Sequence, residues 1–304
     1  MNNHSSFVFK NKIFRKEAFL KYQKLMENDG RSQDDLYKLN WNKRKEIVNH
    51  AYNMIPFYKN HYDSYGFKPS FLKKEEDWNK VPIISKGMIR DNFNDLINPS
   101  LNSDRHQISS TGGTTGVPLK VIHDKKAYLE VNSWRIMKWW GLPLGPNIAF
   151  VFRLTQRSRL ENIVNKLMWF PTKRVFLDAS SISPDNIKPF VDKLVKNNTQ
   201  VLQGYTGALN EVAIYLINNN IQVNCLKAIW CTSSPLTGNI RINLRKAFNA
   251  DIYDQYGSGE VYWIATECTM HNGLHIHSDL RHIDIVDEEE KNLGKGRLGH
   301  IIVT

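Results

Sequence analysis

The stretch QVLQGYTGALNEVAIYLINNNIQVNCLKAIWCTSSPLTGNIRINLRKAFNADIYDQY, residues 200–256, decides the fold class. It contains three short apolar runs that predict strands, at Gln200–Gln203, Leu226–Thr232 and Asp251–Gln255. Between them, and also in Asp185–Asn197, apolar residues recur at i, i+3, i+4 and i+7, a spacing that predicts helices. Strands that alternate with helices of about a dozen residues indicate a parallel sheet with crossover helices. The sequence therefore predicts an α/β fold.

Loops rich in glycine, serine and threonine follow these three strands, at Gly204–Gly207, Ser233–Pro235 and Tyr256–Glu260. Because ligands bind beyond the carboxyl ends of parallel strands, we expect these loops to meet at one edge of the sheet. Glycine lets the backbone approach a ligand, and small hydroxyls supply hydrogen bonds. Turn chemistry alone explains one such loop. Three loops at the same edge, the last with an acid, favour a binding site.

The sequence after Glu260 changes its period. Gly273–Asp279 and Arg281–Asp287 alternate apolar and polar residues, which predicts antiparallel strands. We expect a smaller β-rich subdomain appended to the α/β part.

The net charge of +11 is unevenly distributed, since residues 1–90 hold 18 lysines and arginines against 10 acids, whereas residues 201–304 hold 8 against 11. A basic front could contact nucleic acid or an anionic membrane, or steer a nucleotide. Its basic residues alternate with acidic and apolar ones and form no block, which favours a solvated surface. No nucleic-acid partner is expected.

Three cysteines are too few for a disulfide framework, and the odd number suggests a reducing compartment. Residues 1–19 lack the continuous apolar core of a signal peptide. There is no run of 18 apolar residues, so no membrane span is expected. These features predict a cytoplasmic protein.

The strongest local signal is the stretch at positions 109–116, which consists entirely of serine, threonine and glycine. Such a loop can curl so that successive N–H groups and hydroxyls surround phosphate oxygens. It is not a Walker A motif, because the Gly-Lys-Ser/Thr ending is absent and Leu119–His123 read as a strand rather than a helix. From composition alone, a surface hairpin is an equal alternative.

The stretch Ser110–Pro118 resembles the phosphate loop of the adenylate-forming (AMP-binding) superfamily, and Tyr256–Glu260 resembles its Tyr-Gly-x-[Ser/Thr]-Glu motif. Further segments match the phenylacetate–CoA ligase and capsular polysaccharide (CapK-like) branch in the right order. They are Val48–Tyr58, Val81–Lys86, Gly204–Leu209, Thr232–Leu236, Glu267–Cys268 and Gly273–Ile276. The resemblance covers roughly residues 36–304.

The resemblance implies a large N-terminal AMP-binding domain over residues 36–304, preceded by a helical arm over residues 1–35. It implies that a carboxylate attacks the α-phosphate of ATP, with Mg²⁺ as cofactor, and that a thiol or amine then takes the acyl group. Coenzyme A is one candidate acceptor, and capsule or surface polysaccharide synthesis is the expected process. A homodimer is one candidate assembly.

The resemblance also implies roles for individual residues. Glu260 would bind Mg²⁺ and act in catalysis with Thr114 and Thr115, Tyr256 would pack on adenine, and Tyr205 would border the acyl pocket. The phosphates and the nucleotide would contact Ser110, Thr111, Gly112, Gly113, Thr114, Thr115, Gly116, Ser233, Ser234, Gly257 and Ser258. Three positions depart from the superfamily pattern: Gly259 replaces a hydroxyl residue, Val117 a lysine and Ser234 an acid.

Two groups of residues leave their roles open. The first group is Cys268, His271, His275 and His277, whose side chains could bind zinc or could serve ordinary packing. The resemblance points to Cys268 and His275 as zinc ligands. The second group is Trp134, Trp139, Trp140 and Trp169, which could line an aromatic pocket or belong to the hydrophobic core. The core is favoured, because large aromatic side chains are mostly buried.

The apolar strand Ile301–Thr304 ends where members of the superfamily continue to a small C-terminal domain with a catalytic lysine. We therefore expect a truncated form of the superfamily's fold. The alternatives are a degenerate or fragmentary non-catalytic member, and a basic module that binds nucleic acid or membrane through residues 1–90.

Overall fold

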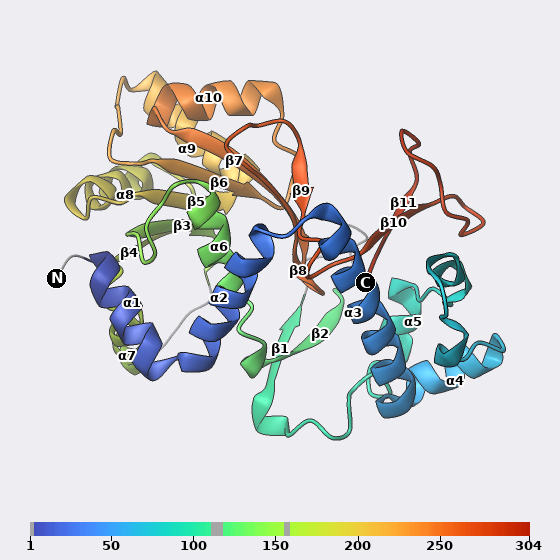
Figure 1. Cartoon of the computed structure of the whole chain (residues 1–304). Helices are drawn as coiled ribbons and strands as arrows, with labels where there is room; N and C mark the ends of the chain where they lie inside the picture. The colour runs from blue at the N-terminus through green and yellow to red at the C-terminus, as the bar shows by residue number, and fades with distance from the viewer. Residues whose placement is uncertain (1–2, 111–117, 155–158) are drawn as a thin grey trace. The chain divides into compact units, whose positions relative to one another are not determined.

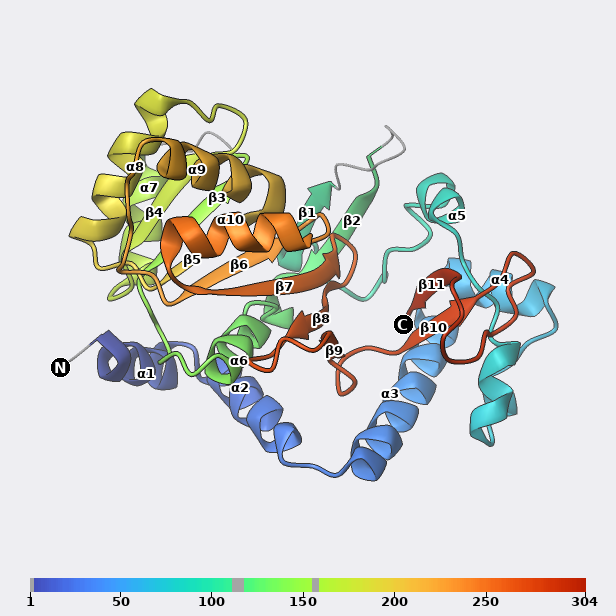
Figure 2. The same cartoon turned by 90° about the horizontal axis from the view of Figure 1, so that it is seen from above.

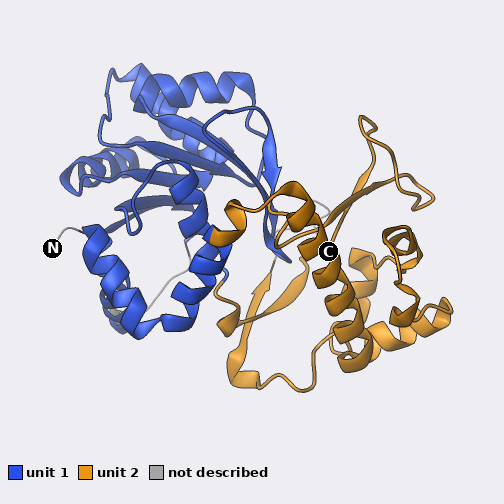
Figure 3. Cartoon of the chain, in the orientation of Figure 1, with its two compact units in different colours: residues 1–26, 129–276 blue, residues 27–128, 277–304 orange. Residues whose placement is uncertain are grey.

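The computed structural model describes residues 3–110, 118–154 and 159–304, and the chain forms two compact units (Figure 3). Unit 1 comprises residues 1–26 and 129–276, and unit 2 comprises residues 27–128 and 277–304. The stretch that predicted the α/β fold lies entirely in unit 1.

Unit 1 is built on a seven-stranded sheet with the order β4-β3-β5-β6-β7-β8-β9 (Figures 1 and 2). Its strands are β3 (Ile148–Phe152), β4 (Arg174–Asp178), β5 (Val201–Tyr205), β6 (Ala228–Thr232), β7 (Asp251–Ser258), β8 (Tyr262–Glu267) and β9 (Leu274–Ile276). The strands from β4 to β7 run parallel, and β8 and β9 are antiparallel to their neighbours. The predicted α/β fold with a largely parallel sheet is confirmed.

Helices cover both faces of this sheet. On one face are α8 (Pro184–Lys196), α9 (Thr206–Asn218) and α10 (Gly238–Phe248), and on the other is α6 (Val131–Trp139). Since successive strand residues point to opposite faces, Ile229 enters the first core and its neighbour Trp230 enters the second. Unit 1 also contains α1 (Asn3–Phe14), α7 (Arg159–Trp169) and most of α2 (Lys16–Asp29).

Gly204 is the second-last residue of β5 and lies opposite Val151 of β3. A Cβ atom at this position would lie 2.7 Å from the carbonyl oxygen of Val151 and 2.9 Å from its Cβ. A side chain here would therefore force the two strands apart. The glycine predicted to admit a ligand has this demonstrable role in strand packing.

Unit 2 contains α3 (Gln33–Met54), α4 (Pro56–Ser64), α5 (Lys86–Asp91) and two antiparallel strand pairs. The pairs are β1 (His106–Ser110) with β2 (Lys120–Asp124), and β10 (Ile283–Val286) with β11 (His300–Val303). The Ser32 hydroxyl accepts the Asp35 N–H and caps the start of α3. Short 3₁₀ turns connect these elements at Pro69–Phe71, Glu75–Lys80, Ser103–Arg105 and Lys125–Ala127.

The strands predicted after Glu260 are present and antiparallel, but they do not form one subdomain. β9 bonds to β8 and extends the large sheet, with Ala265 opposite Ile276, whereas β10 pairs with β11 in unit 2. The free edge of β8 accounts for the difference, because it offers unpaired backbone groups to the next strand along the chain. Among the described residues, no helix combines the length and apolar character that crossing a bilayer requires.

Candidate functional site

A cavity of about 490 Å³ lies in unit 1 at the ends of β5, β6 and β7. Its wall is mainly apolar and aromatic. The aromatic residues in the wall are Phe7, Trp134, Phe150, Phe152, Trp169, Tyr262 and Trp263. Phe7 comes from α1, and Gly145 makes room for it, since a Cβ atom on Gly145 would lie 2.5 Å from the Phe7 ring.

Three polar side chains from adjacent parallel strands also line this cavity: Gln203 of β5, Thr232 of β6 and Gln255 of β7. The Thr232 hydroxyl donates to Gln255 Oε1 at 2.9 Å. This bond fixes the orientation of the amide, because the hydroxyl has one proton to donate. The cavity thus combines apolar walls with oriented polar groups, as small-molecule sites commonly do.

The loop after β6 is held in place by a buried threonine at the start of α9. The Thr206 hydroxyl lies 3.1 Å from the Thr232 carbonyl oxygen and 3.0 Å from that of Ser234. Between these two anchored residues, Ser233 has a φ of 74° and lines the cavity. A serine in the left-handed region costs conformational energy, and such strain is concentrated at functional sites.

The end of β7, the turn after it and the start of β8 form another part of the wall through Gly257, Ser258, Gly259 and Tyr262. A Cβ atom on Gly257 would lie 2.0 Å from the Tyr262 carbonyl oxygen and 2.4 Å from Gln255 Nε2. Glycine is therefore required at this position. Tyr262 itself has a φ of 58°, so both wall-forming loops contain a residue with strained backbone.

The predicted site residues fall into three groups. Ser233, Gly257 and Ser258 line the cavity, whereas Ser234, Tyr256, Glu260 and Tyr205 do not line it although each is next to or within two residues of one that does. Tyr256 is 41% exposed and Glu260 is half-buried. Ser110 ends β1 in unit 2, and Thr111, Gly112, Gly113, Thr114, Thr115 and Gly116 lie outside the described residues.

Several cavity residues were not predicted from the sequence, above all Gln203, Gln255 and Phe152. Gln203 carried a usable signal, because it follows the apolar pair Val201 and Leu202 at the end of a predicted strand. Trp134 and Trp169 line the cavity, while Trp140 stacks in the core on Tyr253 with ring centroids 4.2 Å apart. Two of the tryptophans thus belong to an aromatic pocket, and Trp140 belongs to the hydrophobic core.

Glu130 brings a carboxylate to the cavity wall, and it forms an ion pair with Arg15. The pairing offsets its negative charge. An anionic ligand in the cavity therefore meets less repulsion than an unpaired glutamate would cause.

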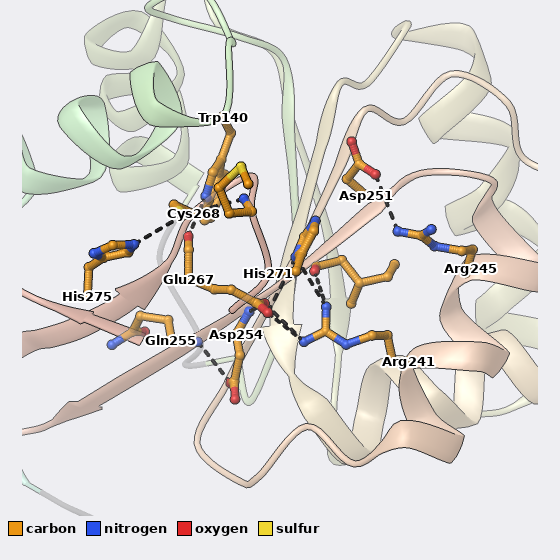
Figure 4. Close-up of polar contacts among 12 residues, drawn as sticks. Trp140, Arg241, Arg245, Asp251, Asp254, Gln255, Glu267, Cys268, His271 and His275 are labelled. Carbon is orange, nitrogen blue, oxygen red and sulfur yellow. Dashed lines mark hydrogen bonds and ion pairs between the residues drawn. The ribbon is translucent and has the colours of Figure 1, made fainter. Parts of the chain in front are cut away.

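A buried charged cluster, the Glu267 cluster, supports the other end of the β7–β8 pair (Figure 4). Arg241 of α10 donates to both carboxylate oxygens of Glu267, at 2.9 and 3.0 Å, and the Asp254 N–H donates to Oε2 at 2.9 Å. Burial, with the Glu267 charge nearby, raises the pKa of Asp254 above its usual range. The cluster ties α10, β7 and β8 together.

Cys268 and His275, the predicted zinc ligands, are brought together by the pairing of β8 with β9. His275 Nε2 lies 3.1 Å from Cys268 Sγ (Figure 4). His271 contacts Glu267 instead, with its Nδ1 atom 3.3 Å from the carboxylate. A structural zinc site needs four ligands, and the part of the chain that the structure describes contains no group of three or more such side chains. The pair by itself does not fit a zinc site.

The fold is that of adenylate-forming ligases. A crystal structure of 2-hydroxyisobutyryl-CoA ligase in complex with 2-HIB-AMP and CoA superimposes on this chain with a TM-score of 0.75 and 17% sequence identity. The match covers 90% of this chain and 60% of the ligase chain. The open conformation of the same ligase matches with a TM-score of 0.72. No family model matches the sequence.

In sequence, the chain is 26% identical over 277 residues to protein CapK of Staphylococcus aureus. The aligned region covers 85% of this chain and 59% of CapK. It is 32% identical over 103 residues to phenylacetate-coenzyme A ligase of Aromatoleum evansii. This aligned region covers 34% of this chain and 23% of that ligase. The chain thus spans 59% or less of these relatives' lengths. The resemblance to the phenylacetate–CoA ligase and CapK-like branch is confirmed.

Proposed function

We propose that the chain is the large nucleotide- and acyl-binding part of an adenylate-forming ligase, spanning residues 36–304 with the helices of residues 1–35 attached. In the first step a carboxylate oxygen attacks the α-phosphate of ATP, which forms an acyl-adenylate and releases pyrophosphate. In the second step a thiol or amine attacks the acyl carbon and releases AMP. The observation that best supports this proposal is the cavity, because its apolar wall adjoins two loops that resemble the superfamily's nucleotide motifs.

The aromatic wall suits the apolar body of a carboxylic acid. Burying such a body excludes water, and the oriented amide of Gln255 supplies a polar contact inside the chamber. Ser233 and Ser258, at the carboxyl edge of the sheet, would contact the carboxylate end and the adenylate. An acid with an aromatic or branched apolar group is the substrate class that this lining favours.

The residues outside the cavity are proposed to hold ATP. Tyr256 is 41% exposed and would pack its ring on adenine, while Ser234 follows the strained Ser233 in the same loop. Ser110 and the loop at 111–116 would hold the phosphates through N–H and hydroxyl donors, with Thr114 and Thr115 at the reacting phosphate.

Glu260 is proposed to bind Mg²⁺. A single carboxylate fits this ion, because Mg²⁺ is commonly held by one or two carboxylates together with substrate phosphates and water. When bound, Mg²⁺ would offset phosphate charge and favour the departure of pyrophosphate. Zinc at Cys268 and His275 would need further ligands and has no part in the proposed reaction.

The acceptor and the biological process are proposed from the relatives. Coenzyme A is the first thiol to test, because the 2-hydroxyisobutyryl-CoA ligase was crystallised with it. Capsule or surface polysaccharide synthesis is proposed from the similarity to CapK. A homodimer remains the proposed assembly.

The test is ATP–pyrophosphate exchange with a panel of apolar carboxylic acids, together with equilibrium dialysis of ATP. We expect exchange that depends on both the acid and Mg²⁺, and its loss in Glu260→Gln. The matched control is Glu211→Gln, at an exposed glutamate of α9, which should leave exchange unchanged. ATP binding without exchange for any acid would favour a degenerate, non-catalytic member. Absence of both would contradict the proposed function.

A further inference from the structure

Helix α7 has an apolar stripe that faces solvent. The stripe follows the i, i+3, i+4, i+7, i+8 spacing and is formed by Leu160, Ile163, Val164, Leu167 and Met168. Each of these side chains is between 54% and 76% exposed. In a helix that packs on a domain this stripe faces the core. On α7 the arrangement is reversed, so the stripe is available to another surface.

Several described contacts hold the C-terminal end of α7. Arg174 of β4 donates to the Asn165 carbonyl oxygen at 3.1 Å, and its guanidinium lies 4.4 Å from the Trp169 ring centroid. Lys10 of α1 donates to the carbonyl oxygen of Phe170 at 2.9 Å and to that of Leu167 at 3.4 Å. It also donates to the carbonyl oxygen of Met168. These bonds use backbone groups of the last turn and leave the stripe uncovered.

Helix α1 extends the apolar surface. Phe9, Ile13 and Phe14 are 59%, 54% and 77% exposed. They lie within four residues of Lys10, whose ammonium group bonds to the end of α7, so the two helices that carry exposed apolar residues are in contact. We call the α7 stripe with these three residues the apolar face.

The segments that carry the apolar face are rich in basic residues. Residues 3–24 hold six lysines and arginines against one glutamate, and residues 159–174 hold four against one. Lys12, Lys16, Lys166 and Lys173 are exposed. A second copy of this chain docking through the same surface would bring like charges together, which is unfavourable. Anionic lipid headgroups above an acyl layer complement both the charge and the apolar stripe.

We propose that α1 and α7 dock unit 1 on an anionic lipid surface, with the apolar face inserted at the boundary between headgroups and acyl chains. The attachment is peripheral and reversible. Trp169 ends α7 and lines the cavity, so docking would hold that part of the cavity wall near the lipid surface. This inference is independent of the proposed reaction.

The test is co-sedimentation of the full chain with vesicles of phosphatidylcholine alone or mixed with phosphatidylglycerol. We expect binding to the mixed vesicles that weakens as salt is added. The double change Ile163→Ser with Leu167→Ser should lower the partition coefficient at least about tenfold. Lys12→Glu with Lys166→Glu should also weaken binding and reduce its salt dependence. The matched control is Ile242→Ser, at a 66% exposed isoleucine on α10, which should bind like the unchanged chain.

Circular dichroism of each variant checks that it is folded, which is expected because every changed side chain is exposed. The proposal is overturned if the unchanged chain does not bind the mixed vesicles, or if the Ile163 and Leu167 variant binds them equally well. It is also overturned if light scattering finds a dimer that this variant dissociates while vesicle binding is absent. That result would assign the apolar face to a second copy of the chain.

Discussion

The two ends of the β7–β8 strand pair are built in different ways. At one end the Glu267 cluster satisfies a buried carboxylate with Arg241 and a backbone N–H, and the register of the two strands has no shift there. At the other end the pairing is irregular at Tyr256/Gly257, Tyr262 has a positive φ, and the turn forms part of the cavity wall. The well-bonded Glu267 end of the strand pair thus supports a turn with strained backbone at the other end. Backbone strain of this kind is concentrated at binding sites.

The largest expected effect is on the stable end. Arg241→Ala leaves the Glu267 carboxylate buried without its main partner, so we expect the free energy of unfolding to fall by about 3–5 kcal/mol. Urea unfolding measures this change. Arg245→Ala is the matched control, because Arg245 and Asp251 form a pair whose side chains are 57% and 59% exposed, and its loss should cost less than about 1 kcal/mol. Equal effects of the two changes would remove the distinction between the two ends.

The next effect is on the strained turn. Gly257→Ala forces a methyl group against the Tyr262 carbonyl oxygen, so we expect a loss of about 1–3 kcal/mol in stability together with loss of ligand binding. Gly207→Ala, in α9, has open space around its Cβ position and should be neutral or slightly stabilising. Thermal unfolding and ATP dialysis on both variants test this. Unchanged binding in Gly257→Ala would separate the turn from the site.

Ser233→Gly should have opposite effects on stability and on function. Glycine adopts a φ of 74° without strain, so we expect stability to rise by about 1 kcal/mol. The looser loop and the lost hydroxyl should raise KM in the exchange assay. If stability rises and KM does not change, the strain at Ser233 serves no binding role.

The smallest effect concerns Asp254 and depends on pH. Its pKa is raised, chiefly by burial, so its charged form is disfavoured in the folded state, and stability should fall as the pH rises from the ordinary value of 3.8 through the folded pKa. Asp254→Asn should therefore stabilise the protein at pH 7 by less than about 1 kcal/mol, since the group is half-buried. Below pH 3.8 the two proteins should unfold alike, as measured by urea titration across pH.

Much of the α/β framework could be predicted because its periodicity is local. The helix expected between the strands at Gln200–Gln203 and Leu226–Thr232 is present as α9, since its apolar stripe is also its buried face. The place of β9 could not be predicted in this way, because the pattern of a half-buried strand does not say which edge it will join. The spacing of apolar residues in α7 does not say whether its stripe is buried.

The candidate site was predictable only in its loops. Ser233 and Gly257 are in motif-like segments and do line the cavity. Its walls come from residues far apart along the chain, such as Phe7, Phe152 and Trp263, which the sheet and its helices bring together. Nothing in the local pattern around these aromatic residues distinguishes a cavity wall from core.

Phe7 makes the first helix part of the candidate binding site. Its ring fills the space beside Gly145 and closes part of the chamber. Deleting residues 1–14, or fusing a bulky tag directly before Asn3, would therefore alter the size of ligand that fits the chamber, even if the sheet folds unchanged. Substrate screens should keep this helix native, because a shortened protein would report the selectivity of a different chamber.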